Sequence, residues 1–250
     1  MALLRFDSTS DRGPSAQIWA GVVDWVRGSL ATALGQRDFE DFAPFNADST
    51  DVAGSAGVAG ALDTTQRFGV LSVTANAGTD ARAAAAREIW YTLQDSPILV
   101  FETRIDQNAD ADDPQVFAGF FDGADFDDVF ADGAIAVSGN QDAIGLLWNA
   151  DETIDIVAVD DGTLTVIKDN IGVTVERTDG YVKLGLRIER PTTTTVRLVP
   201  CVNGVIARSG ITVVASTVVP ENPMRPGVAT TVAATTAPDV DVDFIYSADK

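Results

Sequence analysis

Three aspartates alternate with apolar residues in the closing stretch DVDVDFIYS of the chain. Asp239, Asp241 and Asp243 are two positions apart, and side chains two apart in a strand share one face. Such a row of carboxylates could hold a metal ion, supply catalytic acid and base groups, or form the solvent-facing side of a strand. We predict the solvent-facing side of a closing strand, whose other face is apolar and buried: Val240, Val242 and Phe244.

Two other stretches are rich in oxygen atoms that could bind Ca²⁺, DQNADADD at 106–113 and DGADFDDVFADG at 122–133. Neither stretch has the spacing of the helical calcium-binding loop, and Asp-rich turns are commonly solvated. We therefore predict no metal site. A structural calcium ion is kept as a hypothesis, and the first ligands to test for it are Asp110, Asp112, Asp125, Asp127 and Asp128.

The residue types exclude several kinds of catalysis. The chain has no histidine, so it cannot contain a Ser-His-Asp or Cys-His catalytic system or an imidazole metal ligand. It also has neither a GxxxxGKS loop nor a strand-linked GxGxxG motif, which leaves phosphate-binding loops without sequence support. Any acid–base chemistry would depend on carboxylates alone, and we predict that the chain is not an enzyme and needs no cofactor.

The charge balance limits the partners of the chain. It has 17 basic and 37 acidic residues, a net charge of −20. Nucleic acids and anionic membranes are bound mainly through Lys and Arg, so neither is an expected partner. Arg5 and Asp7 interrupt the N-terminal apolar stretch, and no run of about 18 uncharged apolar residues follows. We expect a protein made in the cytoplasm without a signal peptide.

Composition and patterning favour an all-β chain. Val, Ala and Thr are abundant, and 250 residues suffice for one large β domain. Residues 1–37 show apolar residues at helical spacing and are predicted to form a partly helical or irregular arm, whereas 51–63 are predicted to be a surface loop. The predicted strands are 68–76, 87–93, 98–105, 115–121, 134–138, 143–148, 154–159, 163–168, 172–177, 181–189, 194–202, 211–215, 228–234 and 240–247.

Turn residues separate the predicted strands, with DDG at 160–162, TDG at 178–180 and NG at 203–204. Within 181–189, four apolar residues alternate with polar ones: Val182, Leu184, Leu186 and Ile188. Many short strands without intervening helices predict two antiparallel sheets packed face to face. Cys201 has no partner for a disulfide and lies in strand-like sequence, so we expect it in the core.

The order of these strands resembles the concanavalin A-like jelly rolls in structural proteins of tailed bacteriophages. The resemblance is carried by FEDF at 39–42, then ILVFETRI, VFAGFFD, AIGLLWN, YVKLGLRIER, VRLVPCVNG and the closing VDFIYS. It covers about residues 38–247 and implies a β-sandwich domain at 38–250 behind the N-terminal arm at 1–37. In such folds the first and last strands are neighbours, so 39–45 should lie close to 240–247.

The resemblance implies a non-enzymatic virion protein that decorates or cements the capsid surface, with the major capsid protein or another virion protein as its partner. The same fold serves glycan hydrolases, but their paired carboxylates are missing, because Asp155 in TIDIVAV has no acidic neighbour on its strand face. The alternative is a carbohydrate- or receptor-binding module of a tail or head fibre. Its candidate stacking residues are Trp90, Tyr91, Trp148 and Tyr181, at least two of which we expect to be buried.

The arm carries two of the four tryptophans, Trp19 and Trp25. Because aromatic side chains dominate many contact surfaces, we predict that the arm docks the chain onto the virion or onto copies of itself, with a homotrimer as the first expectation. The alternative is that the arm folds back and covers one end of its own sandwich.

Overall fold

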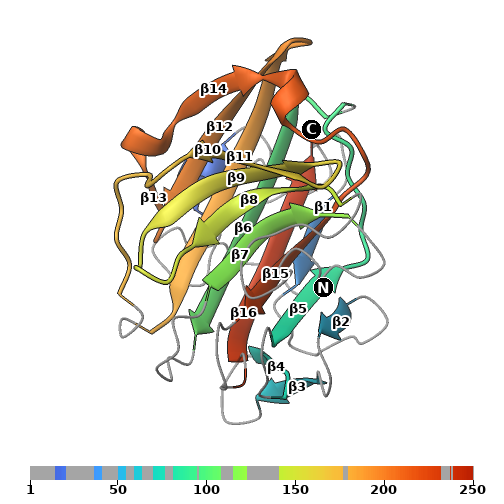
Figure 1. The fold of residues 1–250 in the computed structure, drawn as a ribbon, viewed down its shortest axis with the longest axis vertical. Coiled ribbons are helices and arrows are strands. Elements are labelled where there is room, and N and C mark those ends of the chain that lie inside the picture. The colour runs from blue at the N-terminus through green and yellow to red at the C-terminus, as the bar shows by residue number, and fades with distance from the viewer. Residues whose placement is uncertain are drawn as a thin grey trace, which may run out of the picture.

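The protein is a sandwich of two antiparallel β-sheets in the computed structural model (Figure 1). The model describes residues 15–20, 37–40, 50–54, 59–63, 70–76, 81–94, 96–107, 115–122, 141–176, 180–231, 237 and 239–249. The predicted all-β jelly roll is therefore confirmed. Within the described ranges, no helix has the length and apolar character needed to cross a membrane.

The larger sheet has nine strands in the order β13-β12-β11-β6-β16-β4-β3, with β1 also pairing with β16 and β14 with β12. Its strands are β1 (Arg37–Glu40), β3 (Ala59–Asp63), β4 (Val70–Thr74), β6 (Ile98–Gln107), β11 (Val182–Thr192), β12 (Thr195–Val202), β13 (Val205–Ile206), β14 (Thr212–Ala215) and β16 (Asp239–Asp249). The pairing of β1 with β16 confirms that the first and last strands are neighbours, although 41–45 lie outside the described residues.

The smaller sheet has seven strands in the order β10-β9-β8-β7-β15-β5-β2. Its strands are β2 (Thr50–Gly54), β5 (Arg82–Arg87), β7 (Gln115–Phe121), β8 (Ala143–Trp148), β9 (Ile154–Asp160), β10 (Thr163–Lys168) and β15 (Arg225–Thr231). The described helices are short: α1 (Ala16–Trp19), η5 (Arg208–Gly210) and η6 (Ser216–Val218).

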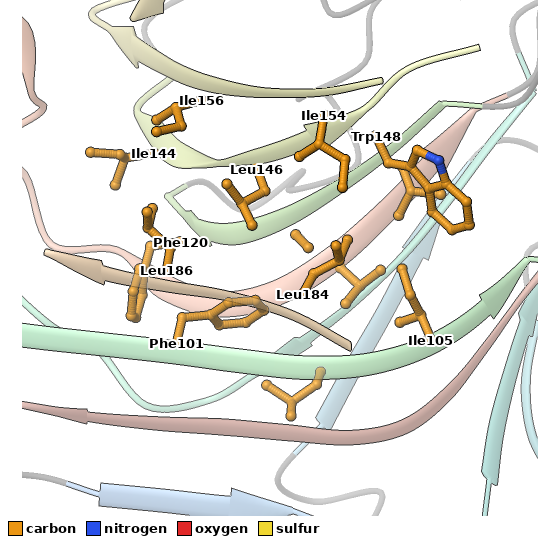
Figure 2. Close-up of a cluster of buried hydrophobic side chains, with 14 of the residues drawn as sticks. Phe101, Ile105, Phe120, Ile144, Leu146, Trp148, Ile154, Ile156, Leu184 and Leu186 are labelled. Atoms are coloured by element: carbon orange, nitrogen blue, oxygen red, sulfur yellow. The ribbon is translucent and has the colours of Figure 1, made fainter. Parts of the chain in front are cut away.

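The main core lies between the two sheets and is built by alternate residues of strands such as β6, β7, β8, β9 and β11 (Figure 2). The Phe120 ring meets Tyr91 and Phe101 edge to face, with both pairs of ring centroids 5.7 Å apart. All four apolar residues of the 182–188 alternation belong to this core, as predicted from their period of two. Tyr91 and Trp148 are buried here as well, so the expectation for the four candidate stacking residues is confirmed.

Two predicted turns take the conformation that their residues favour. Asp161 and Gly162 both have positive φ angles, 47° and 78°, and connect β9 to β10. Asn203 and Gly204 have φ angles of 49° and 80° and connect β12 to β13. Positive φ at both central positions matches the right-handed twist of the flanking strands, which is why Asp-Gly and Asn-Gly predict hairpins well.

The prediction of a surface loop at 51–63 was wrong, because β2 and β3 are edge strands of the two sheets. Small side chains are required there: a Cβ atom at Gly60 would lie 2.7 Å from a methyl carbon of Val52, which itself packs against the core. The scarcity of large side chains therefore reflects close packing between strand edges.

Two other predicted strands were wrong. The strand predicted at 87–93 overlaps β5, the alanine-rich stretch 82–87, only at Arg87, and the rest of it contains only a bridge between Tyr91 and Met224. Residues 172–176 likewise contain only a bridge, at Thr174. The predicted strand at 134–138 lies outside the described residues.

Candidate functional site

The outer face of the seven-stranded sheet, which points away from the main core, is apolar and buried. We call this group the outer aromatic cluster; its members are Ala84, Ala86, Phe117, Phe121, Ala143, Leu147, Val157, Val159 and Ala229. The rings of Phe117 and Phe121 have centroids 5.8 Å apart. A polar ligand would gain no hydrogen bonds from these side chains.

A row of three glycines crosses this face, because Gly227 pairs with Gly119 and Gly119 pairs with Gly145. A Cβ atom at Gly145 would lie 2.6 Å from the Phe117 ring, and one at Gly227 would lie 2.6 Å from the Phe121 ring. The rings thus occupy the space that these glycines leave open. The chain fills this surface with its own side chains.

The closing strand departs from the predicted pattern at Asp243. The register of β16 against β6 shifts between Val242 and Phe244, so Asp243 is the extra residue of a β-bulge. The bulge moves Phe244 to the outer face, where it stacks on Tyr246 at a centroid distance of 4.1 Å. The prediction that Phe244 shares one face of the strand with Val240 and Val242 was therefore wrong, because the bulge breaks the alternation by one residue.

Asp243 is also buried, which corrects the prediction of a solvent-facing carboxylate. Its Oδ2 atom accepts a hydrogen bond from Arg104 Nη1 at 2.8 Å. Asp239 and Asp241 are half-buried, and Asp239 accepts a hydrogen bond from the Ser72 hydroxyl at 3.3 Å. Asp243 and Asp239 thus each bind a side chain of a neighbouring strand, Asp243 on β6 and Asp239 on β4.

We expect Asp243→Asn to lower the free energy of unfolding by about 1–3 kcal/mol, because it leaves the Arg104 guanidinium without its charged partner. The control Asp241→Asn should cost less than about 0.5 kcal/mol, since that side chain is only half-buried. Urea denaturation measures both values. Equal losses would contradict the distinction drawn between the two carboxylates.

Segment 15–20 lies on the outer face of the nine-stranded sheet and is held by the carboxylate of Glu102 on β6. The backbone N–H of Ser15 and the indole N–H of Trp19 both donate to Glu102 Oε2 at 2.8 Å, and the Ser15 hydroxyl donates to Oε1. Glu102 and Trp19 are fully buried. One carboxylate therefore binds both ends of α1.

Arg187 on β11 holds the other side of segment 15–20. Its Nη1 atom donates to the backbone carbonyls of Ile18 at 2.7 Å and Ala20 at 2.6 Å. The Ile18 side chain lies over Gly185, where a Cβ atom would be only 2.6 Å from its terminal methyl group. We call Glu102, Gly185, Arg187 and the apolar residues around them the segment site; the apolar cluster there contains Val100, Cys201, Phe244, Tyr246 and Ala248.

This arrangement bears on the prediction that the arm is a docking element through Trp19 and Trp25. Trp19 packs against the chain's own sheet, so residues 15–20 fold back, onto the outer face of the nine-stranded sheet and not over one end of the sandwich as the alternative had it. Docking of the arm onto other molecules stays a prediction. Trp25 lies outside the described residues, and the homotrimer stays a prediction. Cys201 is buried as predicted, but beneath segment 15–20 and not between the sheets.

Burial raises the pKa of Glu102 above its ordinary value of 4.5, and the hydrogen bonds from Ser15 and Trp19 and the charge of Lys183 offset this only in part. A carboxyl group with a raised pKa stabilises the fold fully below its ordinary pKa, and this contribution is lost as the pH rises through the raised value. The neutral acid also fits the site, because its O–H can donate to the Ser15 hydroxyl while the other oxygen accepts two N–H groups.

We therefore expect Glu102→Gln to become progressively more favourable, relative to the wild type, as the pH rises from about 4 to about 8. Glutamine keeps the acceptor and one donor of the neutral acid, but it does not ionise. The difference in the free energy of unfolding between the two proteins, measured in urea across this range, reports the effect. A difference that is constant, or that changes in the opposite direction, would contradict a raised pKa.

The other candidate residues have structural roles or lie outside the described part. Asp155 Oδ1 accepts the backbone N–H of Asn170 at 2.8 Å, which fixes the turn after β10. The described ranges contain no group of three or more His, Cys, Asp or Glu side chains placed to hold a metal ion. The five candidate calcium ligands lie outside those ranges: Asp110, Asp112, Asp125, Asp127 and Asp128. The structural calcium ion therefore stays a hypothesis.

Trp90 is the candidate stacking residue with the most exposed side chain, at 45%. The guanidinium of Arg225 lies over its ring, 5.2 Å from the centroid. Among the described tryptophans, Trp19, Trp90 and Trp148, only Trp90 has an exposed ring.

A separate pocket lies between Ile188 and Val219. Its volume is about 10 Å³, which leaves room for no more than one water molecule.

Sequence reasoning missed Glu102 and the segment site. A sequence signal for the site does exist: the outward-facing positions of two adjacent strands of the larger sheet are apolar, Ile98 and Val100 on β6 and Tyr246 and Ala248 on β16. A strand that is apolar on both faces must be covered on both. A lone glutamate in such a strand then predicts a polar group in the covering segment.

No protein-family model matches the chain, and a search of curated proteins found no match. Solved structures do match in fold. A protein of unknown function from Shewanella oneidensis MR-1 superimposes with a TM-score of 0.57 at 12% identity, over 95% of this chain and 94% of that one. A β-glucanase of Bacillus licheniformis gives 0.54 at 11% identity, over 86% and 99%.

The lectin UEA-II, in a structure complexed with galactose, superimposes with a TM-score of 0.52 at 12% identity, over 86% of this chain and 99% of the lectin. Together these similarities place the chain in the concanavalin A-like jelly-roll fold of lectins and glucanases. At this level of identity they show the fold alone.

Proposed function

We propose that the chain is a non-enzymatic structural protein of a tailed-bacteriophage virion, which decorates or cements the capsid surface. The observation that carries this proposal is that the outer faces of both sheets bear buried apolar clusters, one filled by Phe117 and Phe121 and the other covered by Trp19. Sheet faces closed in this way favour a stable building block over a substrate groove.

Two further features support the proposal. The net charge of −20 keeps a protein soluble at the high copy number that a surface component reaches before assembly. The described carboxylates that could have formed a catalytic pair are used in packing instead, Asp155 in a turn and Asp243 with Arg104. The sequence resemblance to phage jelly rolls supports a location on the virion surface.

The test is binding to particles that have been stripped of this protein. The purified wild-type chain should co-sediment with such particles, saturate, and raise the temperature at which they disrupt. Trp90→Ala should bind equally well, because the proposal assigns no role to that ring. Failure of the wild-type chain to co-sediment, with particles that still bind their other surface proteins, would contradict the proposal.

The second candidate is carbohydrate binding, which the exposed Trp90 ring favours and the fold of a lectin crystallised with galactose supports. An exposed indole can stack on the apolar face of a sugar. A glycan array decides between the two: binding that Trp90→Ala abolishes would favour this candidate, and no binding at high protein concentration would remove it.

A further inference from the structure

We propose that the segment site is a recognition site for Ser15–Ala20 that the segment of a second copy of this chain can also occupy, so that two copies can exchange their segments. The site recognises specific chemical groups of the segment. Glu102 accepts hydrogen bonds from a backbone N–H, a hydroxyl group and an indole N–H, and Arg187 donates hydrogen bonds to two backbone carbonyls. Such contacts depend on the segment itself and not on which chain supplies it.

The contacts at the rim of the site are also transferable. The side chain of Gln17 accepts the backbone N–H of Ile206 at 3.1 Å, at the outer end of the sheet on β13. Trp19 and Ile18 fill the apolar cluster around Cys201 with fully buried side chains. A second copy could supply every one of these groups in the same geometry, which is why segment exchange is a common route to dimers.

The connection between the segment and the sandwich permits exchange. Residues 21–36 join Ala20 to the start of β1 at Arg37. A connection of this length spans at most roughly 55 Å when extended, enough to reach a neighbouring copy. Tethering gives the chain's own segment an effective concentration on the order of millimolar, so exchange between wild-type chains requires crowding, as on a particle surface.

In a wild-type chain, its own segment competes with the segment of a second copy for the segment site. Two full-length variants, mixed together, remove this competition. Trp19→Ala weakens the segment and leaves the site intact, whereas a chain with Glu102→Ala and Cys201→Ala keeps the segment and lacks the site. The segment of the second variant should then bind the site of the first. We expect a one-to-one complex in sedimentation velocity at roughly 50 μM of each, and Cys201 of the first variant, the only thiol in the mixture, should react at least about fivefold more slowly after mixing.

The control replaces the second variant with one that also carries Trp19→Ala, which should give neither a complex nor protection of the thiol. Circular dichroism and urea unfolding confirm that each chain is folded; if Trp19→Ala is not, Ser15→Ala with Ile18→Ala vacates the site more gently. Folded variants that form no complex and show no protection would overturn the proposal. Particle binding by the wild-type chain does not need exchange, so the two proposals can fail separately.

Discussion

Trp19→Ala should make the thiol of Cys201 react at least tenfold faster with a disulfide reagent under native conditions. In the wild-type chain the thiol is 1% exposed and burial raises its pKa to about 12, with the charge of Glu102 acting in the same direction. Reaction therefore requires segment 15–20 to open. Replacing a buried tryptophan by alanine costs roughly 3–5 kcal/mol, and every 1.4 kcal/mol of lost docking energy raises the open population tenfold.

The chain offers good controls for this measurement. Cys201 is its only cysteine, so the signal has one source. Trp90→Ala removes an indole that is 45% exposed, and it should leave the rate unchanged. Low concentrations of urea distinguish opening of the segment from global unfolding, since local opening exposes little surface and depends weakly on denaturant. An unchanged rate in Trp19→Ala would show that the segment does not cover the thiol.

Gly119→Ala should destabilise the protein more than any other addition of a single methyl group to the smaller sheet. We expect it to lower the free energy of unfolding by about 3 kcal/mol or more. The new Cβ atom would lie 2.4 Å from the carbonyl oxygen of Ile144 and 2.5 Å from the Cα atom of Gly145. Both are backbone atoms of β8, so no side-chain rotation relieves the contact. The pairing of β7 with β8, or the outer aromatic cluster above it, has to shift.

Gly180→Ala is the matched control for conformational cost. Its φ angle is +75°, which disfavours alanine, but a Cβ atom there would meet nothing within 4 Å. We expect a loss of about 1 kcal/mol. Urea denaturation of both variants gives the comparison. Similar losses at the two positions would mean that β7 and β8 are not packed as closely as their paired glycines indicate.

Much of this fold was predictable because its strands carry their own local signals. The β7, β8 and β10 bounds follow from apolar runs that end at turn residues, and Asp-Gly and Asn-Gly turns placed two hairpins. The alanine-rich β5 was missed, because alanine has little preference for strands and its burial depends on neighbours far away in sequence.

The site was less predictable, for a physical reason. The bulge at Asp243 reverses the side-chain alternation of β16, and only the partner strand reveals it. The role of Glu102 depends on Ser15 and Trp19, more than 80 positions away in the chain. Local patterns give the face of a residue, whereas its partner is set by the topology of the sandwich.

The location on the capsid is tested by imaging purified phage particles that carry this protein with a bulky label at its C-terminus. We expect label density over the capsid surface, repeated with the symmetry of the shell. The label follows β16, whose last residues pair with β1 and β6. Purified particles that contain none of the labelled protein, or label confined to the tail tip, would contradict a capsid-decorating role.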